Sequence, residues 1–273
     1  MVYRRADDEF LIVANAGNRF PVMGALTERA NGFDVTLVDE SDELCLIAVQ
    51  GPRARGILEA TPELAHFGIP LDELKYYWST DAEFGEIPVI VGRTGYTGED
   101  GFELYVRADA AASLWQALTA AGSPFGLVPA GLASRDTLRL EAGMPLYGHE
   151  LGLDTFPVQA GLGRVVALTK EVDFVGRVAI EAGPPVGARV LVGLTAEGKR
   201  AGRADYLLFD GDDEVGVITS GALSPTLGYP IAMAYVELGS SAAGTTLDID
   251  VRGSRVAASV VPLPFYKKEE NHG

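Results

Sequence analysis

The chain has 273 residues, 47% of them hydrophobic and 22% charged, which indicates a globular protein long enough for two ordinary domains. Its net charge of −16 argues against nucleic acid as a partner, because a phosphate backbone attracts basic surfaces. A single cysteine, Cys45, excludes an internal disulfide, and three scattered histidines give no sign of a metal site.

The chain opens with MVYRRADDEFLIVANAG, in which basic residues precede an apolar run as they do in a secretory leader. Three acidic residues, Asp7, Asp8 and Glu9, interrupt this pattern, and the apolar run is too short for a leader. We therefore predict a strand over residues 9–16 and expect a cytoplasmic protein. No apolar run has the length of a membrane span, so we expect no membrane partner.

Short runs rich in Val, Ile and Leu predict two further strands, DVTLVD at 34–39 and LCLIAVQ at 44–50. The segment PRARGILEA at 52–60 is typical of a short helix, with Pro52 in its first turn. We thus expect strands and helices to alternate in the first part of the chain.

Two longer helices follow. Asp109 is expected to cap a helix over residues 110–121 that stops at Gly122. The other helix is expected over 132–142, ending at Gly143, and it carries two arginines, Arg135 and Arg139, four residues apart. Residues at that spacing share one face of a helix.

A Pro- and Gly-rich joint at 181–189 separates this region from one with an almost purely β pattern. PIAMAYV (230–236) and TLDIDV (246–251) alternate with period two, and RGSR is a tight turn between the second of these and VAASVV. The pattern predicts a small β-barrel or sandwich after an α+β domain.

Glycines recur at every third position of VIVGRTGYTGEDGFELYV (89–106), at Gly92, Gly95, Gly98 and Gly101. A phosphate cradle is a poor explanation, because neither GxGxxG nor GK[ST] is present and a strand follows instead of a helix. A β-hairpin with an elaborated turn explains the glycines on backbone grounds alone.

A ligand-binding hairpin explains more of the same residues. Glu103 stands between Phe102 and Leu104, and a buried carboxylate can accept two parallel N–H bonds from the edge of a heterocycle. The glycines would let a planar ring lie against the backbone, and Tyr96 could cover that ring. Spacing alone does not decide between this hypothesis and a purely structural turn.

Four stretches together resemble the aminomethyltransferase (T-protein) family of the glycine cleavage system. They are VANAGN at 13–18, VGRTGYTGEDGFELYV at 91–106, ASRDTLRLEAGMPLYGHEL at 133–151 and GVITSGALSPTLGYPIAMAYV at 216–236, supported by AGLGRVV at 160–166 and DFVGR at 173–177. The resemblance implies an α+β folate-binding domain of antiparallel sheets and helices over 1–182 and a C-terminal β-barrel domain over 187–273.

Members of this family take an aminomethyl group from the lipoyl arm of the H-protein, release ammonia and leave methylenetetrahydrofolate. The resemblance therefore implies tetrahydrofolate as acceptor substrate, the lipoylated H-protein as partner, and no metal. Two alternatives stay open: a folate-binding paralogue without transferase activity, and a related folate-dependent demethylase. The iron–sulfur maturation relatives depend on a cysteine-containing KGC motif, whereas this chain has DFVGR at that place.

The resemblance assigns roles to three residues first. Glu103 matches the carboxylate that reads the pterin edge, Tyr96 matches the aromatic beside that ring, and Arg135 matches the arginine that contacts folate. Without the motif, an ion pair with Asp136 or Glu141 would be the ordinary explanation of Arg135.

Four further residues are assigned in the same way. Asn15 falls near the folate nitrogens, Tyr76 and Tyr77 fall where tyrosines help to line the cavity, and Lys268 stands where an arginine is often found. Lysine keeps the charge of that arginine but loses its planar fork.

The chain departs from the family at its start. Family members carry an N-terminal segment that ends in an Asp-Asp pair, shortly before a strand ending in Val-Tyr. Here Val2-Tyr3 matches that pair of residues, so we expect the family's critical aspartate to precede Met1 and assign no catalytic residue. Either Met1 is an internal methionine taken as the start, or the chain is truncated.

Overall fold

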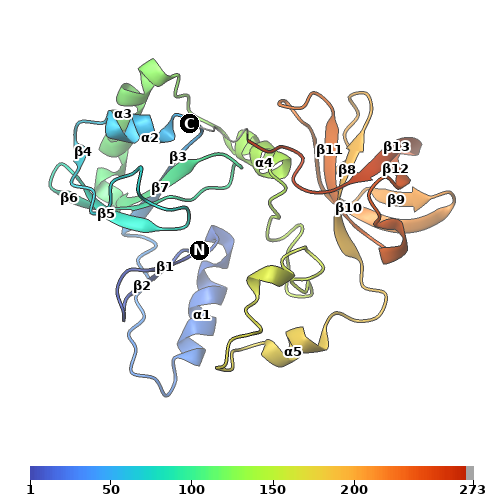
Figure 1. Cartoon of the computed structure of the whole chain (residues 1–273), viewed down its shortest axis with the longest axis horizontal. Helices are drawn as coiled ribbons and strands as arrows, with labels where there is room; N and C mark the ends of the chain where they lie inside the picture. Colours follow the sequence, from blue (N-terminus) through green and yellow to red (C-terminus); the bar gives the residue numbers. More distant parts are fainter. Residues whose placement is uncertain (269–273) are drawn as a thin grey trace. The chain divides into compact units, whose positions relative to one another are not determined.

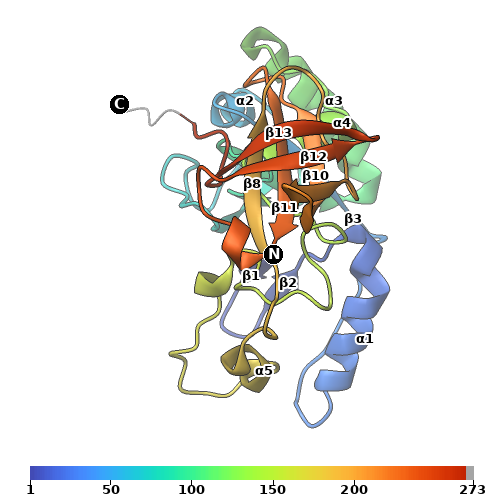
Figure 2. The same cartoon turned by 90° about the vertical axis from the view of Figure 1, so that its right-hand side faces the viewer.

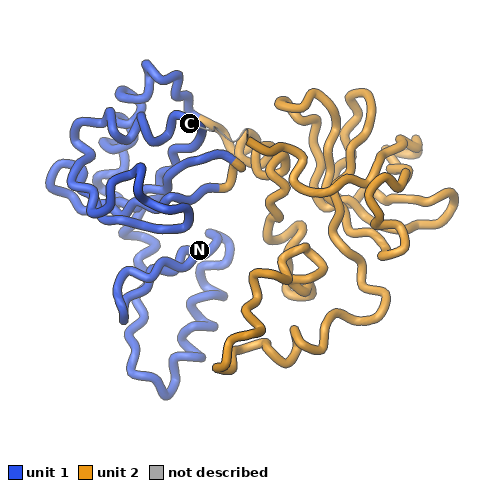
Figure 3. The backbone as a smooth tube through the Cα atoms, in the orientation of Figure 1, with its two compact units in different colours: residues 1–95, 99–129 blue, residues 96–98, 130–273 orange. Residues whose placement is uncertain are grey.

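The computed structural model describes residues 1–268, which form two compact units (Figure 3). Unit 1 contains Met1–Gly95 and Glu99–Pro129, and unit 2 contains Tyr96–Gly98 and the chain from Ala130 onward. The polypeptide therefore passes from unit 1 into unit 2, returns, and passes again. The domain boundary expected at 182–187 stays a prediction.

Unit 1 is built on a five-stranded sheet in which every neighbouring pair is antiparallel. Its strand order is β3-β7-β6-β5-β4, with β3 Leu44–Gln50, β4 Leu64–Ala65, β5 Ser79–Phe84, β6 Ile87–Gly92 and β7 Gly101–Arg107 (Figure 1). The predicted strand at 44–50 is confirmed. So is the hairpin: β6 and β7 pair from Val89↔Val106 to Gly92↔Glu103 around the glycine-rich loop.

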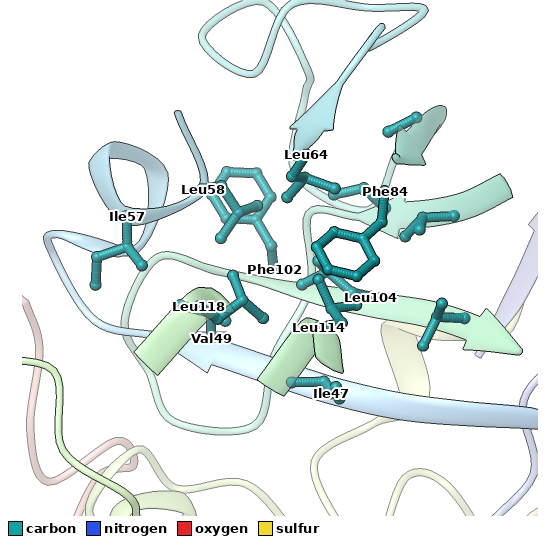
Figure 4. Packing of buried hydrophobic residues seen from close by; sticks show 14 of the residues in the cluster. Ile47, Val49, Ile57, Leu58, Leu64, Phe84, Phe102, Leu104, Leu114 and Leu118 are labelled. Atoms are coloured by element: carbon teal, nitrogen blue, oxygen red, sulfur yellow. The ribbon is translucent and has the colours of Figure 1, made fainter. Parts of the chain in front are cut away.

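The core of unit 1 lies between this sheet and two helices, α2 (Ala54–Glu59) and α3 (Ala111–Gly122). Side chains of a strand alternate between faces, so Phe102 and Leu104 of β7 point to the same side, where they are fully buried with Leu114 and Leu118 of α3 (Figure 4). Full burial of each such side chain contributes about 1.5–3 kcal/mol. The short helices η2 (Ala108–Ala110) and η3 (Ser123–Phe125) flank α3.

The N-terminal part of unit 1 contains β1 (Val2–Arg4), β2 (Phe10–Ile12), η1 (Ala16–Asn18) and α1 (Arg19–Arg29). Strands β1 and β2 form a separate two-stranded antiparallel sheet, so the strand predicted over 9–16 is shorter than expected. The strand predicted over 34–39 is wrong. This segment pairs with no strand of the described chain, and Val35 and Val38 are exposed, so its apolar pattern serves no sheet.

Unit 2 contains α4 (Leu132–Glu141), η4 (Gly163–Val165), α5 (Arg177–Ala182) and a closed barrel with strand order β10-β11-β8-β13-β12-β9. The barrel strands, turned toward the viewer in Figure 2, are β8 Val190–Ala196, β9 Leu207–Asp210, β10 Asp213–Leu223, β11 Pro230–Val236, β12 Thr246–Val251 and β13 Ser254–Val261, with η5 (Leu238–Ser240) after β11. The predicted strands at 230–236 and 246–251 are confirmed, and with them the fold class of an α+β domain followed by a barrel.

The three predicted helices form with small shifts of their ends. The exception is the cap expected from Asp109. Its side chain caps no helix: Ala108–Ala110 form a 3-10 turn before α3, and the Asp109 carboxylate pairs with Arg107 instead. The end of α4 follows the expectation, since Gly143 adopts a φ of 67° that suits glycine after a helix.

Candidate functional site

Glu103 lies on β7, on the face of the sheet opposite the core of unit 1. Its neighbours in the strand, Phe102 and Leu104, are buried in that core, whereas Glu103 is half-buried. In the sheet it pairs with Ala48 on one side and Gly92 on the other, two small residues that leave its carboxylate uncovered by cross-strand side chains. The carboxylate is thus carried by a strand that is paired on both sides, and because it is half-buried it needs hydrogen-bond donors.

Two hydroxyl groups of unit 1 donate to this carboxylate, and a third supports them. Thr94 donates a short hydrogen bond to Oε2 of Glu103, and the Tyr105 hydroxyl lies 3.4 Å from the same oxygen. The Tyr3 hydroxyl lies 2.9 Å from Oγ1 of Thr94 and 3.5 Å from the Tyr105 hydroxyl. Burial raises the pKa of both tyrosines above the ordinary value, so both keep their protons. We call Tyr3, Thr94 and Tyr105 the hydroxyl cluster.

The glycines of the loop make room for side chains of the protein itself. A Cβ on Gly92 would collide with the Tyr3 hydroxyl, and one on Gly95 or Gly101 would collide with the side chain of Gln50. Gln50 uses this space to donate a 3.0 Å hydrogen bond from Nε2 to the carbonyl of Thr94. Tyr3 and Gln50 thus occupy the space beside these three glycines, and the hypothesis that a planar ring lies against the loop backbone stays a prediction.

The ends of the loop are closed by an ion pair between Arg93 and Asp100, with two hydrogen bonds of 2.9 and 2.8 Å. Arg93 also donates to the carbonyl of Leu74 at 2.7 Å, and its backbone carbonyl accepts from the amide of Tyr77 at 2.9 Å. The turn that carries Tyr76 and Tyr77 is thereby tied to the base of the loop.

Tyr76 and Tyr77 are exposed by 40% and 60%, and their ring centroids lie 4.4 Å apart. Tyr77 has a φ of 67°, an uncommon conformation for a bulky residue that marks a constrained turn. The pKa of Tyr76 is raised, first by burial, then by Tyr77, and also by the negative charges of Asp100 and Glu103. In unit 1 the structure thus brings Tyr76 and Tyr77 into the surroundings of Glu103.

Tyr96 and Arg135 lie together in unit 2. The guanidinium carbon of Arg135 is 5.1 Å from the ring centroid of Tyr96, a cation–π distance, and the Tyr96 hydroxyl donates to the carbonyl of Pro145 at 2.7 Å. Arg135 itself is exposed. Its guanidinium thus lies over the ring of Tyr96 from helix α4, at the surface of unit 2.

The ion pairs considered for Arg135 in the sequence do not form, because both acids serve other partners. Asp136 pairs with Arg139 at 2.7 Å, and Glu141 accepts hydrogen bonds from Ser224 and Thr226. Arg135 and Arg139 also differ in exposure despite their spacing, since Arg139 is buried. Arg135 is thus the arginine of α4 with its charge at the surface.

In the part of the chain that the structure describes, no hydrogen bond or ion pair joins Asn15 or Lys268 to the other predicted residues. Asn15 is exposed before η1, and its side chain forms no capping hydrogen bond. Lys268 is exposed at the end of the described chain. Within residues 1–268, no group of three or more His, Cys, Asp or Glu side chains has the arrangement of a metal site. Over the same residues, none of the helices combines the length and apolar character needed to traverse a bilayer.

The hydroxyl cluster was not predicted from the sequence. One signal was available, because Tyr105 stands two residues after Glu103 and residues at that spacing share a face of a strand. Tyr3 lies 91 residues before Thr94, and no local pattern connects two residues at that separation.

Comparisons with known proteins cover nearly the whole chain. The family model described as the GCVT N-terminal domain matches residues 1–170, and the one described as the glycine cleavage T-protein C-terminal barrel domain matches residues 189–267. The chain is 55% identical over 271 residues to an aminomethyltransferase of Cutibacterium acnes, covering 98% of this chain and 73% of that protein. It is 53% identical over 278 residues to an aminomethyltransferase of Streptomyces avermitilis, covering 99% and 73%.

A solved structure agrees with these matches. The crystal structure of the glycine cleavage system aminomethyltransferase T from Bartonella henselae is similar with a TM-score of 0.84 at 34% sequence identity. The similarity covers 97% of this chain and 71% of that one.

Proposed function

Because the chain belongs to the glycine cleavage T-protein family, we propose that it transfers the one-carbon unit of an aminomethyl-lipoyl H-protein to tetrahydrofolate and releases ammonia. It is an enzyme of the aminomethyltransferase family. Tetrahydrofolate is then a substrate, and the lipoylated H-protein is the partner that delivers the donor group. A cytoplasmic location belongs to the same proposal.

One observation carries the folate part of the proposal: Glu103 has one oxygen engaged and the other open. Oε2 accepts from Thr94 and Tyr105, while in the described chain Oε1 has no hydrogen-bond partner. An ionised carboxylate accepts only, so an open oxygen on a fixed strand suits a ligand edge that carries N–H donors. The pterin of folate has such an edge, and Glu103 is proposed to read it.

Arg135 and Tyr96 support the proposal from unit 2. Arg135 is an exposed cation whose position is fixed by the Tyr96 ring, and folate carries an acidic tail as well as a flat ring. We propose that Arg135 contacts the folate and that Tyr96 is the aromatic beside the pterin. Tyr76, Tyr77, Asn15 and Lys268 complete the proposed set of binding residues, and no metal is assigned.

The test is a titration of the purified chain with tetrahydrofolate by calorimetry. Glu103→Ala removes a charged acceptor, and hydrogen bonds to charged groups contribute about 1.5–3 kcal/mol each, so we expect affinity to fall by at least about tenfold. Glu83→Ala is the matched control, because Glu83 is an exposed glutamate on β5 of the same sheet. Equal affinity of the Glu103→Ala variant and the unchanged chain would contradict the proposed folate site.

Transfer is measured separately, as ammonia released from aminomethylated H-protein. We expect release to depend on tetrahydrofolate and to fall in the Glu103→Ala variant. Folate binding without any ammonia release, also in a chain extended by the coding sequence upstream of Met1, would favour a binding protein over a transferase.

A further inference from the structure

We propose that Thr94, supported by Tyr3 and Tyr105, is a positioning residue that fixes Oε2 of Glu103 and thereby points Oε1 toward the ligand. This inference rests on the proposed role of Glu103 in folate binding. It assigns a function in recognition to a threonine and two tyrosines that the binding set above does not include.

The direction of each hydrogen bond follows from counting protons. An ionised carboxylate only accepts, and each hydroxyl has a single hydrogen to give. The hydroxyl groups of Thr94 and Tyr105 therefore both donate their hydrogens to Oε2 of Glu103. The remaining hydrogen, that of Tyr3, goes to Oγ1 of Thr94 at 2.9 Å, since the alternative acceptor, the Tyr105 hydroxyl, is farther away at 3.5 Å.

The cluster is firm enough to hold a side chain in one conformation. Tyr3 is exposed by 2% and Tyr105 by 5%, and their rings meet edge to face with centroids 5.8 Å apart. Gly92 lies beneath the Tyr3 hydroxyl and leaves the space that this hydroxyl needs. Thr94 is 1% exposed, so water does not compete freely for its hydroxyl.

The consequence for binding is preorganisation. A free glutamate side chain rotates about three bonds, and ordering it on binding lowers affinity. In this chain the two donors on Oε2 order it beforehand, which leaves Oε1 as the acceptor for a ligand N–H. Without the Thr94 hydroxyl, the Glu103 side chain is expected to adopt several conformations again before the ligand binds.

The experiment compares three threonine variants by calorimetric titration of the full chain with tetrahydrofolate. Thr94→Val keeps the shape but loses the hydroxyl, and we expect affinity to fall by about tenfold, the size of one lost hydrogen bond to a charged group. Thr94→Ser keeps the hydroxyl and is expected to stay within about twofold of the unchanged chain, which a purely packing role would not produce. Thr61→Val is the control, because Thr61 is equally buried in unit 1 but donates to the carbonyl of Ile57.

A second comparison asks whether Thr94 acts through Glu103. In a Glu103→Met background, where the side chain at position 103 has no acceptor oxygen, Thr94→Val is expected to cause a much smaller loss than in the unchanged chain, because residues in one hydrogen-bond network show coupled effects. Tyr105→Phe removes the other donor to Oε2, and it decides the matter if Thr94→Val does not fold. We expect Tyr105→Phe to weaken binding by about threefold.

The inference is overturned if Thr94→Val folds and binds as tightly as the unchanged chain, if Thr94→Ser loses as much affinity as Thr94→Val, or if the Thr94→Val loss persists in full beside Glu103→Met. These results differ from failure of the proposed function. If Glu103→Ala itself leaves affinity unchanged, the folate site is wrong. If Glu103→Ala abolishes binding while Thr94→Val does not weaken it, only the positioning role is lost.

Discussion

Removing the carboxylate of Glu150 is expected to destabilise unit 2 strongly, because this group is fully buried and paired. Glu150 is 0% exposed and the side chain of its partner Arg139 is 2% exposed, with 3.0 Å between Nη1 and Oε2. The same oxygen accepts from the amide of Leu146 at 2.8 Å, while Oε1 has no hydrogen-bond partner among residues 1–268. Arg139 is further held by Asp136 and Ser220.

The size of the effect follows from the donors that lose their acceptor. In Glu150→Ala the Leu146 amide and one guanidinium N–H are left without an acceptor, and each buried unsatisfied donor costs about 1–3 kcal/mol. This agrees with the cost of about 3–5 kcal/mol for removing one member of a buried ion pair. We therefore expect the free energy of unfolding to fall by about 3–5 kcal/mol. Glu150→Gln keeps an acceptor oxygen and is expected to cost less.

The assay has to follow the barrel itself. Both tryptophans, Trp78 and Trp115, belong to unit 1, so tryptophan fluorescence does not report on unit 2. Unfolding of unit 2 is instead followed by hydrogen exchange of peptides from the barrel strands at increasing urea concentration. The control is Glu181→Ala, which removes a 2.9 Å ion pair between Arg177 and the Glu181 carboxylate, whose side chain is 50% exposed. This change is expected to lower the free energy of unfolding by less than about 1 kcal/mol. A loss below about 1 kcal/mol for Glu150→Ala would refute the reasoning.

Three further predictions concern other groups. Gly98→Ala is expected to cost about 1–3 kcal/mol in urea denaturation, because Gly98 has a φ of 76° and the new Cβ would lie 2.8 Å from that of Ala142. Gly126→Ala, at a φ of 77° with nothing within 4 Å, should show the backbone cost alone. Burial raises the pKa of Tyr235 to about 12, so its contribution to the free energy of unfolding is full below pH 10 and is lost as the pH rises through 12. Tyr235→Phe should reduce this loss of stability at high pH, measured as melting temperature against pH. An unchanged profile would show that Tyr235 does not cause the loss. Arg135→Ala should change the free energy of unfolding by less than about 1 kcal/mol but weaken tetrahydrofolate binding about tenfold, and equal affinity would remove Arg135 from the proposed set.

Local patterns predicted the elements whose signals lie close together in the sequence. The β6–β7 hairpin follows from two apolar runs around a glycine-rich turn, and the end of α4 follows from Gly143. The alternating runs at 230–236 and 246–251 predicted barrel strands, because one face of each is buried in the barrel core. In these cases the period of the hydrophobic residues and the choice of turn residues both agree with the tertiary structure.

Other features depend on contacts that local patterns do not contain. The run at 34–39 has the composition of a strand, but a strand also requires a partner, and none is present in the described chain. The glycine spacing alone left a structural turn and a ligand-binding hairpin both open, and it did not predict that Tyr3 and Gln50 occupy the space beside Gly92, Gly95 and Gly101. The cation–π contact between Arg135 and Tyr96 joins helix α4 to the glycine-rich loop, and no local sequence pattern predicts a contact between these two segments.

The three-residue excursion Tyr96–Gly98 limits how this chain can be divided or recombined. These residues belong to unit 2 although they lie in the loop between two strands of unit 1. A fragment that starts at Ala130 would lack the hydroxyl donor to the Pro145 carbonyl and the ring beneath Arg135. A chimaera that exchanges the chain from Ala130 onward between two relatives must therefore also exchange Tyr96–Gly98, so that the contacts of Tyr96 within unit 2 are kept.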